Sequence, residues 1–106
     1  MQKGEIVLVK FPFTDLSGTK VRPALLLKMI DEDVLLMFIT TNLLSNNGFD
    51  ILVQPSIQNG LKKTSLLKVC KLITLHNTLV YGRLGFLTKS IHQKGINNLH
   101  KFLLID

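Results

Sequence analysis

The chain has 106 residues, of which 46% are hydrophobic, and a formal net charge of +6. The length and apolar content predict one folded domain over residues 1–106 and exclude a disordered chain, while a single cysteine, Cys70, excludes an internal disulfide and a cysteine-based zinc cluster. The positive charge fits ordinary solubility or a polyanionic partner, either nucleic acid or an acidic protein segment.

We expect a cytoplasmic protein that does not bind membranes. The N-terminus shows no signal-peptide pattern, no apolar run reaches membrane-spanning length, and one unpaired thiol suits a reducing compartment.

Short strand signals dominate the first half of the chain. Glu5–Phe11 partly alternates and is rich in β-branched residues, which predicts a strand. Thr14–Lys20 is a polar loop. Val21–Met29 is almost wholly apolar and predicts a strand covered on both faces. A tight turn at residues 31–33 joins it to a third strand, Val34–Thr41, so the two form a hairpin.

Further short strands follow. A polar loop, Asn42–Gly48, precedes a short strand at Phe49–Val53. The connection Pro55–Lys63 contains an Asn-Gly turn signal, and Ser65–Leu72 alternates as a strand does. The secondary structure of Leu75–Val80 is ambiguous, and glycines at positions 82 and 85 are expected to interrupt regular structure after it.

The last segment has helical spacing instead. Residues 88–90 offer an N-cap, and a glycine at position 95 weakens the helix by about 1 kcal/mol relative to alanine. The apolar positions that should face the core are Ile91, Ile96, Leu99, Phe102 and Leu103. Many strands and one terminal helix predict a mainly β fold, a small antiparallel barrel capped by a C-terminal α-helix.

Three stretches carry a family likeness in the expected order. They read GEIVLVKFPFTDLSGTKVRPALLL (Gly4–Leu27), VLLMFIT (Val34–Thr40) and TSLLKVCKLITL (Thr64–Leu75). Together they resemble the PemK/MazF family of toxins from type II toxin–antitoxin pairs, and the resemblance covers nearly the whole chain. It implies an SH3-like β-barrel with a C-terminal helix that forms a homodimer.

The resemblance also implies an activity. Most family members are sequence-selective endoribonucleases, or mRNA interferases, that need neither metal nor cofactor. They cut single-stranded RNA to leave a 2′,3′-cyclic phosphate and a 5′-hydroxyl. An acidic antitoxin tail occupies the same groove, and operator DNA is contacted only through the antitoxin complex.

Two residues match the family's catalytic pair. Arg22 corresponds to the catalytic arginine, and its planar guanidinium suits a phosphate. Without the resemblance, an arginine at this position would more readily be a solvated strand end or an ion-pair partner. Pro23 should hold Arg22 in an extended backbone. Thr40 corresponds to the active-site threonine, and Thr41 takes that place if the register is shifted by one residue.

The loop between the first two strands is expected to form a wall of the RNA groove. Within it, Phe13 could stack a base, Ser17 is a further candidate contact, and Lys20 could meet a phosphate. Some relatives carry a catalytic histidine in this loop, and this chain has none there.

The later strand departs from the family pattern. Where many members have an arginine and an acidic residue spaced two apart, this chain has Lys68 and Cys70, which should share one face of the strand. Lys68 keeps the charge without the bidentate fork. Cys70 replaces a carboxylate only with a strongly lowered thiol pKa, and otherwise fits as a small buried residue. Ser65, at the start of this strand, is another possible RNA contact.

Two alternatives to a ribonuclease remain open. One is a gyrase-binding toxin of the CcdB type, although the C-terminal residues that such a toxin would use, Leu103–Asp106, include no aromatic side chain. The other is a catalytically weak family member that acts through antitoxin and operator binding, for which Lys68 and Cys70 argue. His92 and His100 are expected to be surface or half-buried residues, His76 is a minor catalytic candidate, and the three histidines predict no metal site.

Overall fold

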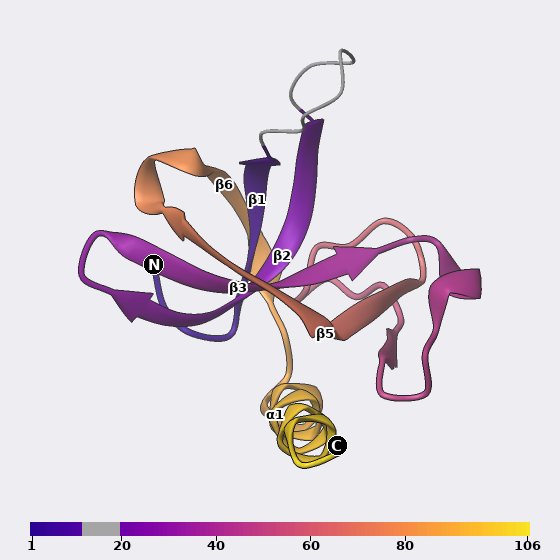
Figure 1. The fold of residues 1–106 in the computed structure, drawn as a ribbon. Helices are drawn as coiled ribbons and strands as arrows, with labels where there is room; N and C mark the ends of the chain where they lie inside the picture. Colours follow the sequence, from indigo (N-terminus) through magenta and orange to yellow (C-terminus); the bar gives the residue numbers. More distant parts are fainter. Residues whose placement is uncertain (12–19) are drawn as a thin grey trace.

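Six strands and one C-terminal α-helix form the described part of this computed structural model, residues 1–11 and 20–106 (Figure 1). The mainly β class with a terminal helix is therefore confirmed. The elements are β1 (Glu5–Phe11), β2 (Lys20–Ile30), β3 (Asp33–Thr40), the 3₁₀ turn η1 (Leu43–Ser45), β4 (Ile51–Val53), β5 (Ser65–His76), the 3₁₀ turn η2 (Asn77–Leu79), β6 (Val80–Phe86) and α1 (Lys89–Leu103).

The strands form one antiparallel sheet in the order β4-β5-β3-β2-β1-β6. The two outermost strands, β4 and β6, are not neighbours in this order. Instead, the connection after β4 reaches β6, where the amide of Phe86 donates to the carbonyl of Gln58 at 2.8 Å. The barrel thus closes through a turn of the β4–β5 connection rather than through a final pair of strands.

The central strands bury side chains on both faces. On β2, Leu25 and Leu27 belong to one hydrophobic cluster, while Ala24 and Leu26 belong to a second. The first cluster also packs against α1, and the second is covered by partly buried residues from β5 to β6. The expectation that the apolar second strand is covered on both faces is confirmed for residues 24–27, whereas Val21 and Met29 are exposed.

The helix approaches the sheet closely because of a glycine. Its N-cap is Thr88, as predicted, and Thr88 Oγ1 accepts a hydrogen bond from the amide of Ile91 at 3.3 Å. Gly95 is buried, and a Cβ at this position would lie 3.1 Å from Cδ2 of Leu67 on β5. The glycine that weakens the isolated helix therefore improves its packing in the fold.

The predicted core face of the helix is partly wrong. Ile91 and Leu99 pack against the core, but Ile96 is 37% exposed and Leu103 is 67% exposed. Since Gly95 lies at the centre of the contact, residues on its own side of the helix face the sheet. The apolar residues beyond that side remain at the surface.

The later strands differ most from the sequence prediction, while the bounds of β2, β3 and β4 differ by one or two residues. The fifth strand runs on to His76, four residues past the predicted end. The sixth passes through Gly82 and Gly85, which were expected to break the chain. A Cβ built on Gly85 would overlap the carbonyl oxygen of Gln58, so this glycine serves a close backbone approach. In the described part of the chain, no helix is long and apolar enough to cross a membrane.

Gly85→Ala tests how the barrel closes. The new methyl group would overlap the Gln58 backbone, and we expect a loss of about 1–3 kcal/mol in the free energy of unfolding, the usual cost of overpacking. The control is Gly82→Ala on the same strand, where nothing lies within 4 Å of the new Cβ. Urea unfolding that gave both variants the same stability would contradict closure through this contact.

Candidate active site

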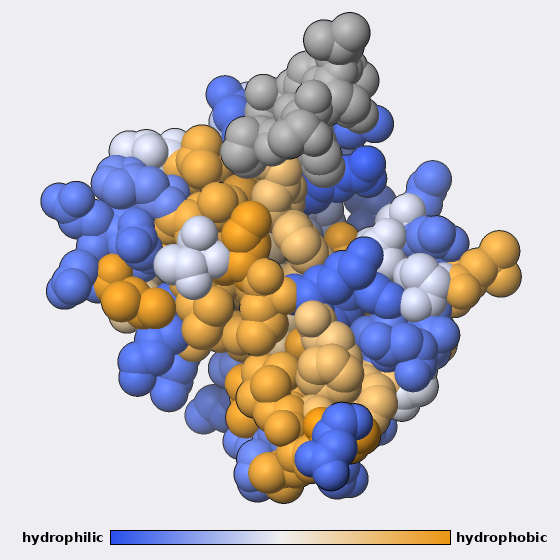
Figure 2. Space-filling model, viewed as in Figure 1, coloured by the Kyte–Doolittle hydropathy of each residue, from blue (hydrophilic) through white to orange (hydrophobic). Residues whose placement is uncertain are grey.

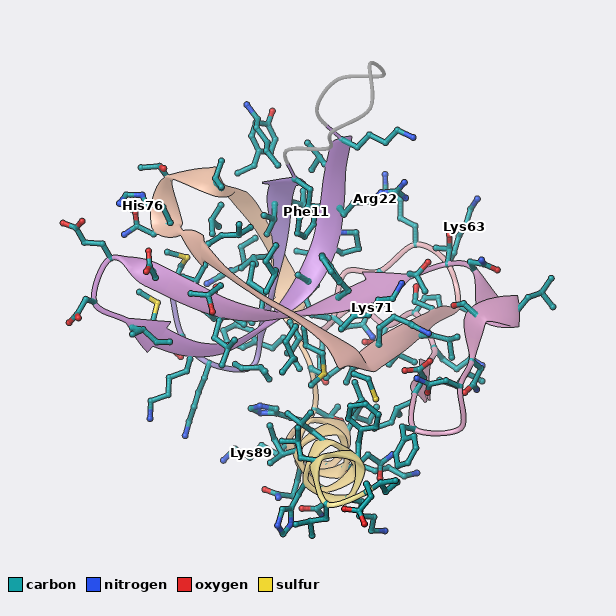
Figure 3. The ribbon with its side chains drawn as sticks, viewed as in Figure 1. Phe11, Arg22, Lys63, Lys71, His76 and Lys89 are labelled. Carbon is teal, nitrogen blue, oxygen red and sulfur yellow. The ribbon has the colours of Figure 1, made fainter. Side chains whose placement is uncertain are left out.

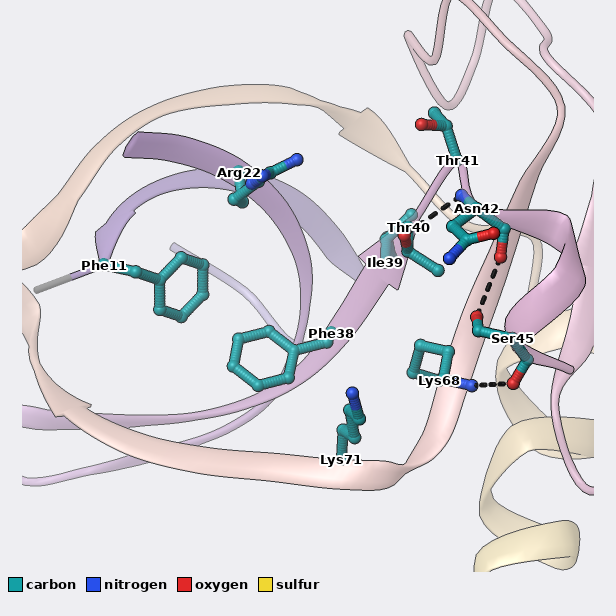
Figure 4. A pocket seen from close by; sticks show the side chains of 10 residues that line it. All are labelled: Phe11, Arg22, Phe38, Ile39, Thr40, Thr41, Asn42, Ser45, Lys68 and Lys71. Carbon is teal, nitrogen blue, oxygen red and sulfur yellow. Dashed lines mark hydrogen bonds between the residues drawn. The ribbon is translucent and has the colours of Figure 1, made fainter. Parts of the chain in front are cut away.

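An open pocket of about 500 Å³ lies where β2 and β3 separate (Figures 3 and 4). It combines basic, aromatic and hydroxyl side chains from β1, β2, β3, η1 and β5 and from the segment that follows β3. The lining residues are Phe11, Arg22, Phe38, Ile39, Thr40, Thr41, Asn42, Ser45, Lys68 and Lys71.

The pocket opens where a proline of β2 ends the pairing between β2 and β3. The β2–β3 ladder has its last pair at Ala24 and Phe38. The next residue of β2 is Pro23, which has no amide hydrogen with which to continue the ladder. Extending the register by two residues sets Arg22 across from Thr40, on ends of β2 and β3 that are no longer paired with each other. The Arg-Pro dipeptide therefore creates the gap and supplies one of its walls.

Arg22 is exposed on β2, and its side chain points toward the end of β3 that carries Thr40 and Thr41 (Figure 4). No hydrogen bond or ion pair joins it to another residue within the described ranges. A guanidinium in this position keeps all its donors available, and two parallel N–H groups match two oxygens of a phosphate.

Thr40 is oriented by the chain that follows it. The amide of Asn42 donates to Thr40 Oγ1 at 3.1 Å, which occupies a lone pair and leaves the hydroxyl proton free to donate. Thr41 also lines the pocket, just beyond the end of β3. Because side chains alternate along a strand, Thr40 lies on the same face as Phe38.

The ammonium of Lys68 is held in a buried ion pair. Lys68 Nζ lies 2.5 Å from Asp50 Oδ2 and donates to the carbonyl of Ser45 at 2.6 Å. The side chains of Lys68 and Asp50 are only 6% and 0% exposed. Lys68 thus forms part of the pocket wall with its charge compensated. Asp50 was missed from the sequence, because an aspartate beside a short strand is an ordinary turn signal and does not indicate burial.

The strand β5 bulges beside this ion pair. Phe38 of β3 is opposite Lys68, but the preceding Met37 is opposite Leu72, so residues 69–71 are additional on β5. Asp50 Oδ1 accepts from the amide of Val69 at 3.1 Å, at the start of this segment. The prediction that Lys68 and Cys70 share one face assumed regular alternation, which does not hold across a bulge. Lys71 lines the pocket, and Cys70 is not among the lining residues.

Two aromatic rings line the pocket near Arg22. The ring centroids of Phe11 and Phe38 are 4.7 Å apart, and the ring planes are inclined by 58° (Figure 4). Phe38 is half-buried. Its place two residues before Thr40 on one strand would have been sufficient to predict it as a neighbour of the site.

Comparison with known proteins agrees with this geometry. A family described as PemK-like, MazF-like toxin of type II toxin–antitoxin system matches residues 2–103. The chain belongs to this family. A search of curated protein sequences gave no match.

Solved structures of MazF proteins share the fold. The Mycobacterium tuberculosis toxin MazF-mt6 aligns with a TM-score of 0.76 at 18% identity, over 96% of this chain and 98% of that one. MazF from Deinococcus radiodurans aligns with a TM-score of 0.78 at 13% identity, over 99% and 97%. A mycobacterial endoribonuclease in complex with its cognate antitoxin aligns with a TM-score of 0.76 at 19% identity, over 100% and 97%.

Two other residues that the PemK/MazF resemblance suggested, Ser65 and Lys20, are not among the described residues that line the pocket. Ser65 is buried, and its hydroxyl donates to the carbonyl of Lys63 at 2.9 Å. Lys20 is exposed at the start of β2 and does not line the pocket. Phe13 and Ser17 lie outside the described residues.

None of the three histidines lines the pocket. His76 lies beside η2, where its Nδ1 is 2.9 Å from Thr78 Oγ1. Burial and the nearby charge of Lys3 lower the pKa of His92, which favours its neutral form. His100 is exposed on α1.

The pocket is positively charged overall. Among the residues that the structure describes, the ionisable ones that line it are Arg22, Lys68 and Lys71, and none of these carries a carboxylate. Since Asp50 compensates Lys68, the uncompensated charges are those of Arg22 and Lys71. Such a pocket attracts anions, and its aromatic rings favour an anion that carries a flat ring.

Replacing Lys68 tests the buried ion pair. Lys68→Met leaves the Asp50 carboxylate buried without its cation, and we expect a loss of about 3–5 kcal/mol in the free energy of unfolding. The double variant Asp50→Leu/Lys68→Met should be more stable than Lys68→Met, since no buried charge then remains. Lys28→Met, at an exposed strand position, is the control and should unfold like the wild type in urea. Equal unfolding midpoints for Lys68→Met and Lys28→Met would contradict the assignment.

Proposed function

We propose that this protein is the toxin of a type II toxin–antitoxin pair and that it acts as an endoribonuclease. Its substrate is single-stranded RNA, cut at short sequences without metal to leave a 2′,3′-cyclic phosphate and a 5′-hydroxyl. The observation that carries this proposal is the convergence of Arg22 and Thr40, on two separating strand ends, in one positively charged pocket.

The chemistry requires little from the protein. The 2′-oxygen of the substrate attacks the adjacent phosphorus, the bond from phosphorus to the 5′-oxygen breaks, and the cyclic phosphate remains. The 2′-hydroxyl passes its proton to water, and the departing 5′-oxygen takes one from water. Arg22 stabilises the charge that develops on the phosphorane oxygens through two N–H donors, and the Thr40 hydroxyl adds a third.

The same pocket suits the rest of a nucleotide. The half-buried ring of Phe38 offers a face on which a base can stack, and stacking tolerates different bases. The net charge of +6 attracts the RNA backbone from a distance. Substrate, protein and reaction therefore belong in the cytoplasm, where mRNA is available.

The partner that controls this activity is an acidic antitoxin. Two solved relatives support this, the mycobacterial endoribonuclease with its cognate antitoxin and a MazE–MazF complex from Deinococcus radiodurans. An acidic segment in the pocket would neutralise Arg22 and exclude RNA. Operator DNA is then contacted through the antitoxin complex.

The proposed ribonuclease functions as a homodimer. A 106-residue chain has a small core, and apolar side chains gather over α1 and the neighbouring face (Figure 2). The most exposed of them near the end of α1 are Leu103, Leu104 and Ile105, at 67%, 72% and 61%.

Light scattering tests the dimer. At micromolar concentration we expect twice the chain mass of 11.9 kDa. Leu104→Asp should shift the protein toward the monomer, because burial of a carboxylate in an apolar interface is costly. Leu44→Asp is the control, since this side chain is 96% exposed on η1, away from α1. A wild-type mass of 11.9 kDa would contradict the dimer.

Cleavage of a long RNA in EDTA tests the catalytic assignment. Loss of one preorganised donor lowers the rate by about 10²–10³, and Arg22→Ala should lose at least this much, because a full charge is removed as well. Arg22→Lys should recover only part of the rate, since an ammonium lacks the planar fork. Thr40→Val should cost less than Arg22→Ala.

The control for these variants is Arg83→Ala, which removes the chain's other arginine from β6, outside the pocket. Arg83→Ala should cut RNA as the wild type does. Wild-type cleavage by Arg22→Ala would refute the role of Arg22, and a wild type that leaves RNA intact would indicate the weak, antitoxin-binding member instead.

A further inference from the structure

Lys71 is a second uncompensated cation in the pocket. It is exposed on β5, and Figure 4 shows its ammonium extending from that strand toward Phe38, across the pocket from Arg22. Its Nζ has no hydrogen-bond or ion-pair partner among the residues that the structure describes. An ammonium in this position attracts an anionic ligand into the pocket.

The position of Lys71 depends on the bulge of β5. Because residues 69–71 have no counterpart on β3, the regular alternation of side chains is interrupted, and both Lys68 and Lys71 reach the pocket. Without the bulge, Lys68 and Lys71, at positions i and i+3 of one strand, would face opposite sides of the sheet. The irregularity therefore adds one positive side chain to this wall.

The bulge is held by Asp50. One carboxylate oxygen binds the ammonium of Lys68 at 2.5 Å, and the other accepts from the amide of Val69 at 3.1 Å. Lys68 is tied in turn to the carbonyl of Ser45. One buried carboxylate thus neutralises one lysine of the pocket and fixes the backbone that presents the other.

We propose that Lys71 binds an RNA phosphate adjacent to the one held by Arg22, and that Asp50 is the positioning residue for Lys71. This inference rests on the proposed function for its substrate. Arg22, with its planar fork, holds the scissile phosphate, whereas Lys71 contributes a point charge that accepts a phosphate in many orientations. The aromatic ring of Phe38 lies between the two cations, where the intervening nucleotide would stack.

Binding of a 2′-O-methyl RNA oligonucleotide tests this assignment apart from catalysis, because its blocked 2′-oxygen prevents cleavage. Lys71→Gln should weaken binding roughly tenfold at low salt, and the slope of log affinity against log salt should fall by about 0.7, the value for one phosphate on a single strand. Lys71→Arg should restore both quantities. Lys28→Gln, the same change on an exposed position of β2 outside the pocket, should alter neither.

Two further measurements distinguish the role of Lys71 from the roles of Arg22 and Asp50. With cleavable RNA, Lys71→Gln should raise KM and leave kcat nearly unchanged, whereas loss of Arg22 lowers kcat. In the background Asp50→Asn/Lys68→Met, which removes the ion pair without releasing a new cation, Lys71→Gln should cause no further loss of binding. A full additional loss there would refute the positioning role of Asp50.

The outcomes distinguish this inference from the proposed function. If the wild type binds the oligonucleotide and Lys71→Gln behaves like Lys28→Gln, the assignment of Lys71 is wrong while the ribonuclease stands. If Lys71→Gln shows the expected loss but the wild type cuts no RNA, the cleavage activity is wrong while the phosphate site stands. A wild type that does not bind the oligonucleotide would overturn both.

Discussion

The buried ion pair between Lys68 and Asp50 joins the parts of the chain that form the pocket. It connects β5 to the residue before β4, and through the carbonyl of Ser45 to η1. Its carboxylate also holds the amide of Val69 in the bulge. A buried ion pair is weak support for stability in itself, but breaking it on one side leaves an uncompensated charge in the fold. The arrangement of the pocket wall therefore depends on both partners remaining in place.

Local sequence chemistry accounts for most of the fold. The first strand was predicted with the bounds that the structure has, because its alternation and β-branched residues agree with its burial. The centre of the apolar second strand, residues 24–27, is covered on both faces as expected. The helix began where the N-cap indicated, whereas its buried face depends on Gly95 meeting Leu67. A contact between elements far apart in the sequence leaves no trace in helical periodicity.

The difference between local sequence chemistry and long-range contacts also explains which residues of the site could be predicted. Arg22 and Thr40 were identified by resemblance, and the missing amide of Pro23 gives a physical reason why they lie across one gap. Lys71 and Asp50 could not be found this way. The family pattern pointed to Lys68 and Cys70, and strand alternation predicted that they share one face. The bulge, which a carboxylate from another segment stabilises, brings Lys71 to the pocket. Irregularities that depend on tertiary contacts are the part that the sequence pattern does not predict.

The central claim is that the substrate supplies its own nucleophile while Arg22 and Thr40 stabilise the reacting phosphate. The most direct measurement uses two copies of one RNA oligonucleotide, one with ribose throughout and one with a single 2′-deoxy nucleotide on the 5′ side of the cleaved bond. The account predicts that the wild type binds both copies, cuts only the all-ribose copy, and leaves a 2′,3′-cyclic phosphate. Cleavage of the deoxy copy at the same bond would contradict it.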